Sequence, residues 1–410
     1  MVQELETDYL VVGAGAMGLA FVDEVLTRSP TARAIIVDKR AKPGGHWNNA
    51  YPFVSLHQPA ALYGVNSETL GTGGAALASG GEVLAYFERA MNKWVETGRL
   101  QFFPMCEYLG DNEFASILAG GREYRVTVRK KTVDATYMKV EVPATKEPVY
   151  AVAPEIPLIP PNGLTNIAQP WSGYVIIGGG KTGIDSVLFL LELGVDPDLI
   201  SWIIPNDSWF LDRDHFTPGK IASAGVAQLE CLTSATTLRG LFESLEGTGL
   251  VLRLDPTVWP TKYRCATVNH HELEQLRGIR NVIRMGRVER IEPSKIILQQ
   301  GRIATNPNTL HVDCTADGLA RRDVVPIFDG NRVTLQSVFM CQQVFSAAIV
   351  GFIETQYDDD ETKNSLCQVI QHPEFERDYV SALTVSVENA TGWVKHLWSW
   401  LRASRLFLIR

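Results

Sequence analysis

Asp8-Tyr-Leu-Val-Val-Gly13-Ala-Gly15-Ala-Met-Gly18, close to the N-terminus, sets the architecture of this chain. Its apolar half is typical of a buried parallel strand, and the glycines that follow predict a tight turn into a helix. Gly13 permits the turn, Gly15 lets the backbone approach a pyrophosphate because it has no Cβ, and Gly18 lets the helix pack closely on the strand. This order of elements predicts a dinucleotide-binding unit of the Rossmann type.

The residues that follow complete the predicted unit. The first turn of the helix contains Ala16 and Met17, whose backbone N–H groups would face the phosphates of the ligand. A second apolar strand at residues 34–37 ends in Asp38, where a carboxylate accepts hydrogen bonds from ribose hydroxyls. We therefore expect Asp38 and the adjacent Lys39 to contact the cofactor.

The same pattern occurs a second time, as Tyr174-Val-Ile-Ile-Gly178-Gly-Gly180-Lys-Thr-Gly183. The second copy begins about 165 residues after the first, counted from Gly13 to Gly178, and an apolar helix is predicted at residues 184–193. Two copies predict an α/β fold with two dinucleotide-binding, Rossmann-like domains.

The start of the second predicted helix contains Lys181 and Thr182, which also suggest a phosphate-binding P-loop. That motif requires a glycine at position 175, where this chain has Val175, so we reject it. Lys181 then either adds a positive charge beside a pyrophosphate or is simply solvated.

The second site lacks the acid that favours NAD. No Asp or Glu ends the predicted strand at residues 199–204, and the nearest basic residue beyond it is Arg213. A basic residue there favours the 2′-phosphate of NADP. The alternative for Arg213 is an ion pair with Asp212 or Asp214.

Composition limits the class of protein. The chain has 410 residues and a net charge of −8, which argues against nucleic acid as a partner. Its six cysteines are scattered without a CxxC pair and are expected to be reduced, mostly buried thiols of a cytoplasmic protein. We find no signal peptide, no apolar run long enough to span a membrane and no metal site, since the adjacent pair His270-His271 is a poor chelate.

The run Gly44-Gly45-His46-Trp47, a few residues after Asp38, resembles a specific family. Class B flavoprotein monooxygenases, which include the flavin-containing and Baeyer–Villiger monooxygenases, have Gly-Gly-Thr-Trp at this place. The resemblance implies that Gly45, His46 and Trp47 wrap FAD at the first site and that NADPH binds at the second.

The family layout predicts a discontinuous FAD domain with the NAD(P)H domain inserted into it. Residues 1–170 and 294–380 would form the FAD domain, residues 171–293 the NAD(P)H domain, and residues 381–410 a basic, tryptophan-rich helix. Residues 123–129 and 132–142 are predicted as strands of one antiparallel meander. The family's Ala-Thr-Gly crossover would lie at residues 143–146, and a second crossover at 309–318 would bring Asp317 and Gly318 to the flavin.

The C-terminal segment from Trp393 to Arg410 contains three tryptophans, four Lys or Arg residues and no acid. One reading is a helix that docks on its own domain or on the second subunit of a homodimer. The other is an amphipathic helix at a membrane surface.

The chemistry is expected at His57-Gln58-Pro59. The family has a Thr-Asn-x-Pro-Lys stretch here, whose asparagine contacts the cofactors, and this chain also lacks the family's Phe-x-Gly-x-x-x-His fingerprint. Gln58 would take the amide role and His57 that of a general acid or base, since its ordinary pKa lies near neutrality. Alternatively, both residues only pack against the flavin.

The resemblance implies an FAD- and NADPH-dependent monooxygenase. It would use molecular oxygen to oxygenate a small organic substrate through a flavin C4a-(hydro)peroxide. Two alternatives stay open: a flavin-dependent oxidase or reductase that does not insert oxygen, and a non-enzymatic regulatory protein that binds flavin or NADPH.

Overall fold

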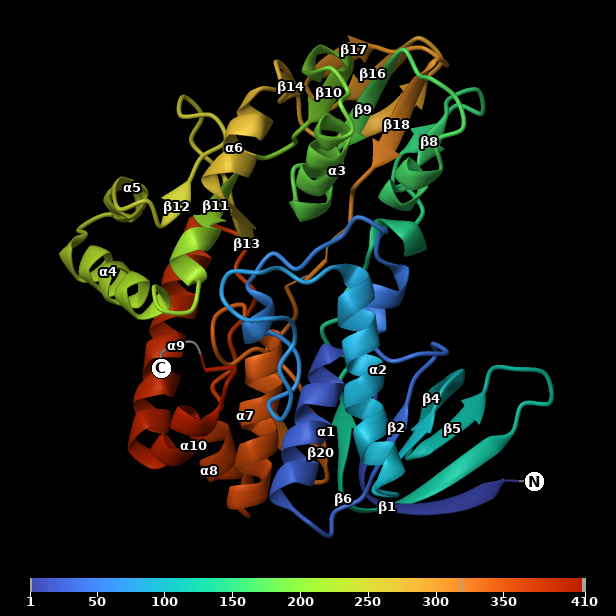
Figure 1. Cartoon of the computed structure of the whole chain (residues 1–410), viewed down its shortest axis with the longest axis vertical. Helices are drawn as coiled ribbons and strands as arrows, with labels where there is room; N and C mark the ends of the chain where they lie inside the picture. The colour runs from blue at the N-terminus through green and yellow to red at the C-terminus, as the bar shows by residue number, and fades with distance from the viewer. Residues whose placement is uncertain (1, 317, 320, 408–410) are drawn as a thin grey trace.

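The computed structural model describes residues 2–316, 318–319 and 321–407. Figure 1 shows two sheet-based units stacked along the long axis of the molecule, with a group of smaller elements beside them. Asp317, which the sequence analysis placed beside the flavin, lies outside the described residues.

The first unit is built around the long strand β1 (Gln3–Val12). Parallel partners flank it on both sides, β2 (Ala34–Val37) on one and β6 (Glu123–Asp134) on the other. The remaining strands of this sheet are β3 (Leu100–Phe103), β4 (Cys106–Gly110), β5 (Glu113–Ser116), β19 (Phe328–Asp329) and β20 (Arg332–Thr334). The main order is β19-β20-β6-β1-β2-β3, and β4 and β5 extend the sheet from β6.

Three helices form the body of the first unit: α1 (Ala16–Arg28), α2 (Gly80–Glu96) and α7 (Gln343–Gln356). They lie side by side in the lower half of Figure 1. Residues 344–354 of α7 are all buried, and all of them except Ser346 and Glu354 are apolar or glycine. It approaches α1 so closely that a Cβ on Gly351 would lie 3.0 Å from the carbonyl oxygen of Phe21.

The predicted meander at residues 123–142 is wrong in part. β6 continues without a turn from Glu123 to Asp134, and residues 135–142 form no strand. The physical reason is the partner: β6 pairs in parallel with β1 along most of its length, so it ends where β1 ends. Its antiparallel neighbour is β5, which contacts only its first residues.

The second unit repeats the topology of the first. Its strands are β8 (Leu158–Ile159), β9 (Gly173–Ile177), β10 (Ile200–Ile203), β14 (Asn281–Ile283) and β18 (Thr309–Asp313), and its main helix is α3 (Lys181–Glu192). The strands are parallel in the order β14-β10-β9-β18-β8, and the first four match β3-β2-β1-β6 in position and in chain order. The edge strands differ in connection, because β8 precedes β9 in the chain whereas β20 follows β6. The expected boundaries at residues 170 and 293 both lie inside this unit, since β8 precedes the first and β18 follows the second.

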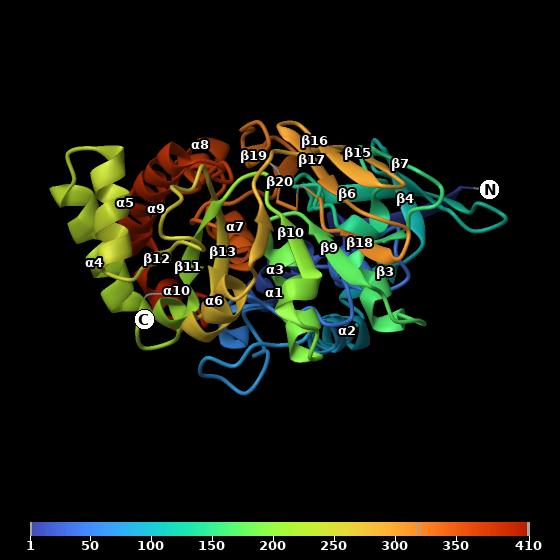
Figure 2. The same cartoon turned by 90° about the horizontal axis from the view of Figure 1, so that it is seen from above.

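Two smaller sheets complete the strands. One contains β12 (Val251–Leu252), β11 (Ser208–Asp212) and β13 (Lys262–Val268), and with it lie α4 (Ile221–Ser234), α5 (Leu238–Gly247) and α6 (His270–Arg277). The other contains β17 (Gly301–Ala304), β16 (Lys295–Leu298), β15 (Val288–Glu292) and β7 (Ala151–Val152), and β16 and β17 form an antiparallel hairpin. Figure 2 shows the first of these groups beside the C-terminal helices, well apart from the second.

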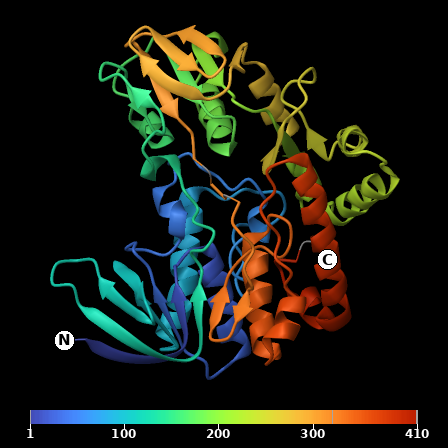
Figure 3. The same ribbon diagram turned by 180° about the vertical axis from the view of Figure 1, so that it is seen from behind.

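The C-terminal segment packs on its own chain. It contains the end of α9 (Glu376–His396) and α10 (Trp398–Ala403), which with α8 (Asp360–Ser365) flank α7 in Figure 3. Trp400 is buried and its Nε1 donates to Glu24 on α1 at 2.6 Å, and Arg405 donates to the carbonyl oxygens of Ala61 and Tyr63 at 2.7 Å each. Docking within the chain is thus the reading that the structure supports; the homodimer stays a prediction. Among the described residues, no helix is both long and apolar enough to cross a membrane.

Candidate functional site

The first glycine turn has the geometry that the sequence predicts. Gly13 has a φ of +105°, and a Cβ on Gly18 would lie only 2.2 Å from the carbonyl oxygen of Gly13. α1 begins with Gly15 as its N-cap, and no side chain caps the helix. Side chains cap α2, α5, α6 and α8, whereas α4, α7, α9 and α10 lack such a cap as α1 does; among the described α-helices, only α1 and α3 have a glycine N-cap. The first amides of α1 are therefore available to an anion.

Asp38 is held in place by two backbone amides. Its Oδ2 accepts from the N–H of Ala14 at 2.7 Å and its Oδ1 from the N–H of Arg40 at 2.8 Å, and the residue is buried. Lone pairs on both oxygens remain for ribose hydroxyls. Lys39 turns away to an exposed ion pair with Glu107 at 2.6 Å.

The Gly44-Gly45-His46-Trp47 run lies against the glycine turn. A Cβ on Gly45 would approach the Cα of Gly15 to 3.0 Å, so a larger residue would not fit easily at position 45. Trp47 is buried and donates from Nε1 to the Tyr63 hydroxyl at 2.9 Å, and the ring of His46 stacks on it at 5.4 Å. Burial, helped by Arg40, lowers the pKa of His46 to about 4.

The crossover of the first unit is not at residues 143–146 as expected. Ala135 and Thr136 directly follow β6 and lie at the glycine turn: a Cβ on Gly13 would meet the Thr136 methyl group at 2.9 Å. Residues 143–145 instead form a short 3-10 helix. The expectation followed the letters Ala-Thr, whereas the position is fixed by the parallel pairing of β6 with β1.

A repeated turn marks both crossovers, and the sequence analysis missed it. Asp134 Oδ1 accepts from the N–H and hydroxyl of Thr136 at 2.8 and 2.7 Å. Asp313 Oδ1 accepts from the same groups of Thr315 at 3.0 and 2.6 Å. The signal was present as Val-Asp-x-Thr at residues 133–136 and again at 312–315.

The second glycine turn repeats the first in detail. Gly178 has a φ of +127°, and a Cβ on Gly183 would lie 2.0 Å from the Gly178 carbonyl oxygen. α3 also has a glycine N-cap, Gly180, and no side-chain cap. A second helix start in this fold is therefore open to an anion.

Lys181 is neither a lone charge nor a solvated side chain. Its Nζ forms an ion pair with Asp185 one turn further along α3. Asp185 also accepts from the Tyr51 hydroxyl at 2.6 Å, so the first and second units touch here. Thr182 lies beside it at the start of α3.

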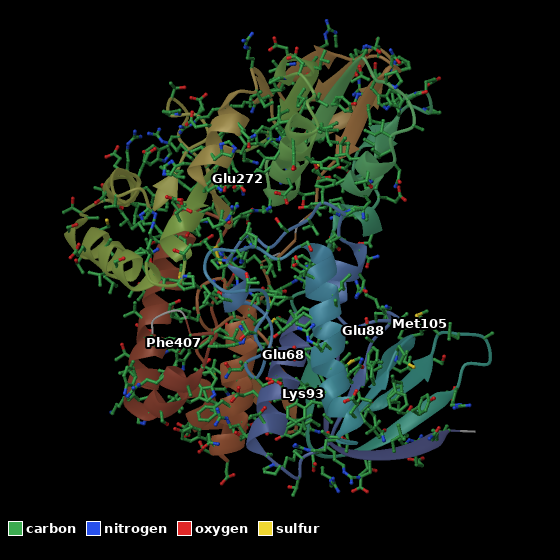
Figure 4. All side chains as sticks on the ribbon, viewed as in Figure 1. Glu68, Glu88, Lys93, Met105, Glu272 and Phe407 are labelled. Atoms are coloured by element: carbon green, nitrogen blue, oxygen red, sulfur yellow. A yellow bond between two sulfur atoms is a disulfide. The ribbon has the colours of Figure 1, made fainter. Side chains whose placement is uncertain are left out.

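Arg213 does not occupy the position that the sequence analysis gave it. It is buried, and its guanidinium forms two hydrogen bonds with Glu272 of α6 at 2.9 and 2.8 Å. Figure 4 labels Glu272 below α6, toward the centre of the molecule. Neither expected partner, Asp212 or Asp214, pairs with it. The pair with Glu272 lies 59 positions away in sequence, beyond the reach of a local pattern.

A cavity of about 810 Å³ lies between the two units, the small sheet β12-β11-β13 with α4, and α9. Of the predicted residues it brings together His57, Gln58, Gly178, Gly180, Lys181, Thr182 and Gly318. The first glycine turn, Asp38, Trp47 and Arg213 do not line it. The further walls come from β13, α4, α9 and the loop before α7.

His57 is fixed by its backbone and has an unpaired ring nitrogen. Its carbonyl oxygen accepts from the Thr267 hydroxyl and from Arg213 Nε, the latter at 3.3 Å. Its ring lines the cavity, and Nδ1 has no hydrogen-bond partner among the described residues. Burial, with Lys181 and Arg213 nearby, lowers the pKa of His57 to about 3, so the imidazole is neutral at pH 7. Gln58 donates to the Leu62 carbonyl oxygen at 3.1 Å.

His372 is a cavity residue that the sequence analysis missed. It is buried, it lines the same cavity, and its Nδ1 also lacks a partner among the described residues. Burial, with Arg264 nearby, lowers its pKa to about 4. No motif surrounds His372 in the sequence, so only the fold could place it beside His57.

Because the imidazoles of His57 and His372 are enclosed, we expect the free energy of unfolding to fall in acid. The pKa of His57 falls to about 3 and that of His372 to about 4, whereas unfolded histidine titrates near 6.5. The unfolded chain therefore binds more protons than the folded chain below pH 6.5, and stability falls as the pH drops from about 6.5 toward 4. We expect His372→Asn to lower the pH slope of the free energy of unfolding by up to one proton, measured by denaturant unfolding between pH 7 and 5.

The exposed Gln356 provides a control, because Gln356→Asn changes no titratable group and should leave this slope unchanged. Equal slopes for wild type and His372→Asn would contradict a neutral, enclosed His372.

Two cysteines depart from the expectation of six reduced thiols. Cys265 on β13 and Cys341 in the loop before α7 form a disulfide, and both line the cavity. Cys106, Cys231, Cys314 and Cys367 are free and buried. The partners are 76 positions apart, which no local spacing could reveal.

We expect alkylation of the denatured, unreduced chain to label the four free cysteines only, and labelling after reduction to reach all six. Mass spectrometry of the peptides should show Cys265 joined to Cys341. A Cys265→Ser chain, with no partner for Cys341, should label all of its five cysteines without reductant. Full labelling of the unreduced wild type would contradict the pairing.

Comparisons with known proteins come from sequence and from solved structures. No protein-family model matches the chain. It is 45% identical over 423 residues to uncharacterised proteins of Mycobacterium bovis and of Mycobacterium tuberculosis, and the match covers 99% of this chain and 78% of each relative.

Solved structures with a similar fold include flavin monooxygenases. A flavin-containing monooxygenase from Stenotrophomonas maltophilia matches with a TM-score of 0.54 at 16% identity, over 86% of this chain and 99% of that one. A polycyclic ketone monooxygenase from Thermothelomyces thermophila matches with a TM-score of 0.57 at 13% identity, over 99% and 86%. Cyclohexanone monooxygenase from Rhodococcus sp. Phi1, bound to NADP+, matches with a TM-score of 0.52 at 12% identity, over 98% and 91%. The chain therefore belongs to the same family as the mycobacterial proteins, and it has the fold of the class B flavoprotein monooxygenases.

Proposed function

We propose that this chain is a monooxygenase that uses FAD, NADPH and molecular oxygen to oxygenate an organic substrate. The observation that carries the proposal is the repeat: two units of one topology, each with a glycine turn that leads into a helix without a side-chain cap. The cavity of about 810 Å³ beside the second turn supplies the space for a reaction. The shared fold with solved monooxygenases supports this choice of chemistry, as an analogy of fold.

The first unit fits FAD. The N–H groups of Ala16 and Met17 would hold the pyrophosphate at the start of α1. Asp38, already oriented by two amides, would accept the ribose hydroxyls. Gly45 and Trp47 would enclose the cofactor from the other side of the turn, and Gly318 would allow backbone close to it.

The second unit fits the pyrophosphate of NADPH at Gly180 and Thr182, with Lys181 beside it. Arg213 is unsuited to the 2′-phosphate because Glu272 already pairs with it. Arg287 takes that role in our proposal. It follows β14, the neighbour of β10, and its side chain is exposed at the cavity together with Asn206.

The reduced flavin, once bound, supplies the electrons for oxygen activation. The protein's own contribution is to position the reactants and exclude water. His57, held by Thr267 and Arg213, presents a neutral imidazole that can donate or accept one hydrogen bond at the substrate without adding charge. Gln58 donates one amide N–H to Leu62, which leaves its second N–H and its carbonyl oxygen for other partners.

One observation favours the alternative of a flavin-dependent reductase without oxygen insertion. The Cys265–Cys341 disulfide lines the same cavity. It could accept two electrons from NADPH by way of the flavin, and with two protons it would become a pair of thiols. Anaerobic NADPH would then expose two additional thiols per chain, whereas the monooxygenase leaves the number of thiols unchanged.

The test of oxygen insertion uses isotopically heavy dioxygen. We would incubate the FAD-loaded protein with NADPH and a panel of alkyl ketones, amines and sulfides under heavy oxygen gas. The proposal predicts a product that contains one heavy oxygen atom. Oxidation of NADPH without label in any product would favour the oxidase or reductase.

A further inference from the structure

We propose that the substrate is an elongated apolar molecule with one uncharged polar group. Its apolar chain would lie in a slot between α4 and α9, and its polar group would lie at His57 and His372. This inference rests on the proposed function, since it takes the cavity as the substrate site.

The first wall of the slot is one face of α4. Ile221, Gly225 and Leu229 lie four positions apart, so they share a face of the helix, and Ala222 and Val226 lie beside them. All five line the cavity. Val226 is 56% exposed and Leu229 40%, and both belong to the cavity lining. A Cβ on Gly225 would meet nothing within 4 Å, so this wall is open.

The second wall is one face of α9. Leu383, Ser386, Val387 and Ala390 follow the same helical spacing and line the cavity. Figures 1 and 2 both show α4 beside α9. The only hydroxyl of this wall is not available, because Ser386 donates to Ala382 at 2.7 Å and accepts from Met340 at 2.9 Å. Among the described residues, α4 and α9 contribute no charged side chain to the cavity lining.

The two walls carry no charge and are apolar apart from Gln228 on α4 and the hydrogen-bonded Ser386 on α9, which favours an apolar ligand. Exposed valine and leucine side chains gain free energy when an apolar ligand removes water from them. A nicotinamide cofactor at Gly180 would occupy the part of the cavity at the glycine turn. The slot is formed by different elements, α4 and α9, and stays free. The slot therefore fits the substrate better than the cofactor.

The inner end of the cavity selects an uncharged polar group. His57 and His372 each have an unpaired Nδ1, and both rings are neutral at pH 7. Two nearby cations, Lys262 and Arg264, both pair with Glu374, at 2.6 and 2.9 Å. Each of these cations therefore already has a carboxylate partner, whereas a hydroxyl or carbonyl would find imidazoles whose Nδ1 atoms lack one.

The experiment measures binding without turnover. Straight-chain primary alcohols from hexanol to dodecanol would be titrated into the FAD-loaded protein by calorimetry, in the absence of NADPH. We expect the dissociation constant to fall by about fourfold for each added methylene until the slot is filled. Decanoate should bind at least about tenfold more weakly than decanol, because its carboxylate would exchange water for two neutral imidazoles.

Two variants test where the alkyl chain of the ligand lies. Val226→Asp should weaken decanol binding by more than about tenfold. Val394→Asp is the matched control: Val394 is 50% exposed on α9 but does not line the cavity, and this change should have no effect. His372→Phe should weaken every alcohol by a similar factor, independent of chain length, because it removes the partner of the hydroxyl.

An alcohol affinity that does not depend on the length of the alkyl chain would overturn the proposed slot. Equal effects of Val226→Asp and Val394→Asp on decanol binding would overturn it too. Failure of the proposed function looks different: the alcohols would bind as predicted, but no labelled product would form with NADPH. The two ideas are therefore tested separately.

Discussion

Gly15→Ala should abolish FAD binding and leave the fold intact, and Gly180→Ala should remove NADPH binding and leave FAD in place. Both glycines are helix N-caps with extended backbone, φ −78° and −87°, which alanine adopts without strain. A Cβ on Gly15 would lie 3.8 Å from Gly45, an ordinary contact, and one on Gly180 would meet nothing within 4 Å. The cost falls on the ligand, because the new methyl group occupies the space through which a pyrophosphate would approach the backbone.

We expect each substitution to weaken its own cofactor by at least about 100-fold, which corresponds to roughly 2.7 kcal/mol. The measurements are FAD retention by absorbance and NADPH affinity by calorimetry, with circular dichroism and thermal unfolding as checks on the fold. The matched positions act as controls for each other. Loss of both cofactors in both variants, or of neither, would contradict two separate sites.

Glu272→Gln should destabilise the protein by about 3 kcal/mol, because it leaves the charge of the buried Arg213 without a partner. Gln keeps the reciprocal cap with Asn269, in which the Glu272 side chain accepts from the Asn269 N–H at 2.9 Å, so the change removes mainly the charge. The free energy of unfolding in urea measures the effect. Glu272 is partly exposed, which places the expected cost at the low end of the range for a buried pair.

The double variant Arg213→Met with Glu272→Gln removes both charges and should recover most of this stability. Its NADPH affinity should equal that of the wild type, whereas Arg287→Ala should raise the NADPH dissociation constant about tenfold through the lost charge–phosphate contact. A large loss of NADPH affinity in the double variant would indicate that Arg213, and not Arg287, binds the 2′-phosphate.

The local features of the site were predictable from sequence and the distant ones were not. The turn from Gly13 to Gly18 and its second copy follow from steric rules that act within a few residues, so both were predicted correctly in conformation. Asp38 has the expected position at the end of β2, and the structure adds that it is buried. Whether these residues bind the cofactors remains to be measured.

The errors arose where a residue's role depends on a partner far along the chain. Arg213 meets Glu272, Cys265 meets Cys341, and His372 joins His57, all across more than 50 positions. The misplaced crossover has a different cause: two Ala-Thr pairs lie close in sequence, and only the pairing of β6 with β1 distinguishes them. A repeated Val-Asp-x-Thr would have resolved that choice.

The central claim is that electrons pass from a nicotinamide at the second unit to a flavin at the first. The most direct test is an anaerobic titration of the FAD-loaded protein with NADPH, followed by visible absorbance, and then the admission of air. The account predicts that one equivalent of NADPH bleaches the flavin, that air restores its colour, and that Gly180→Ala prevents the bleaching. A protein that stays colourless when supplied with FAD, or a bound flavin that NADPH does not reduce, would contradict it.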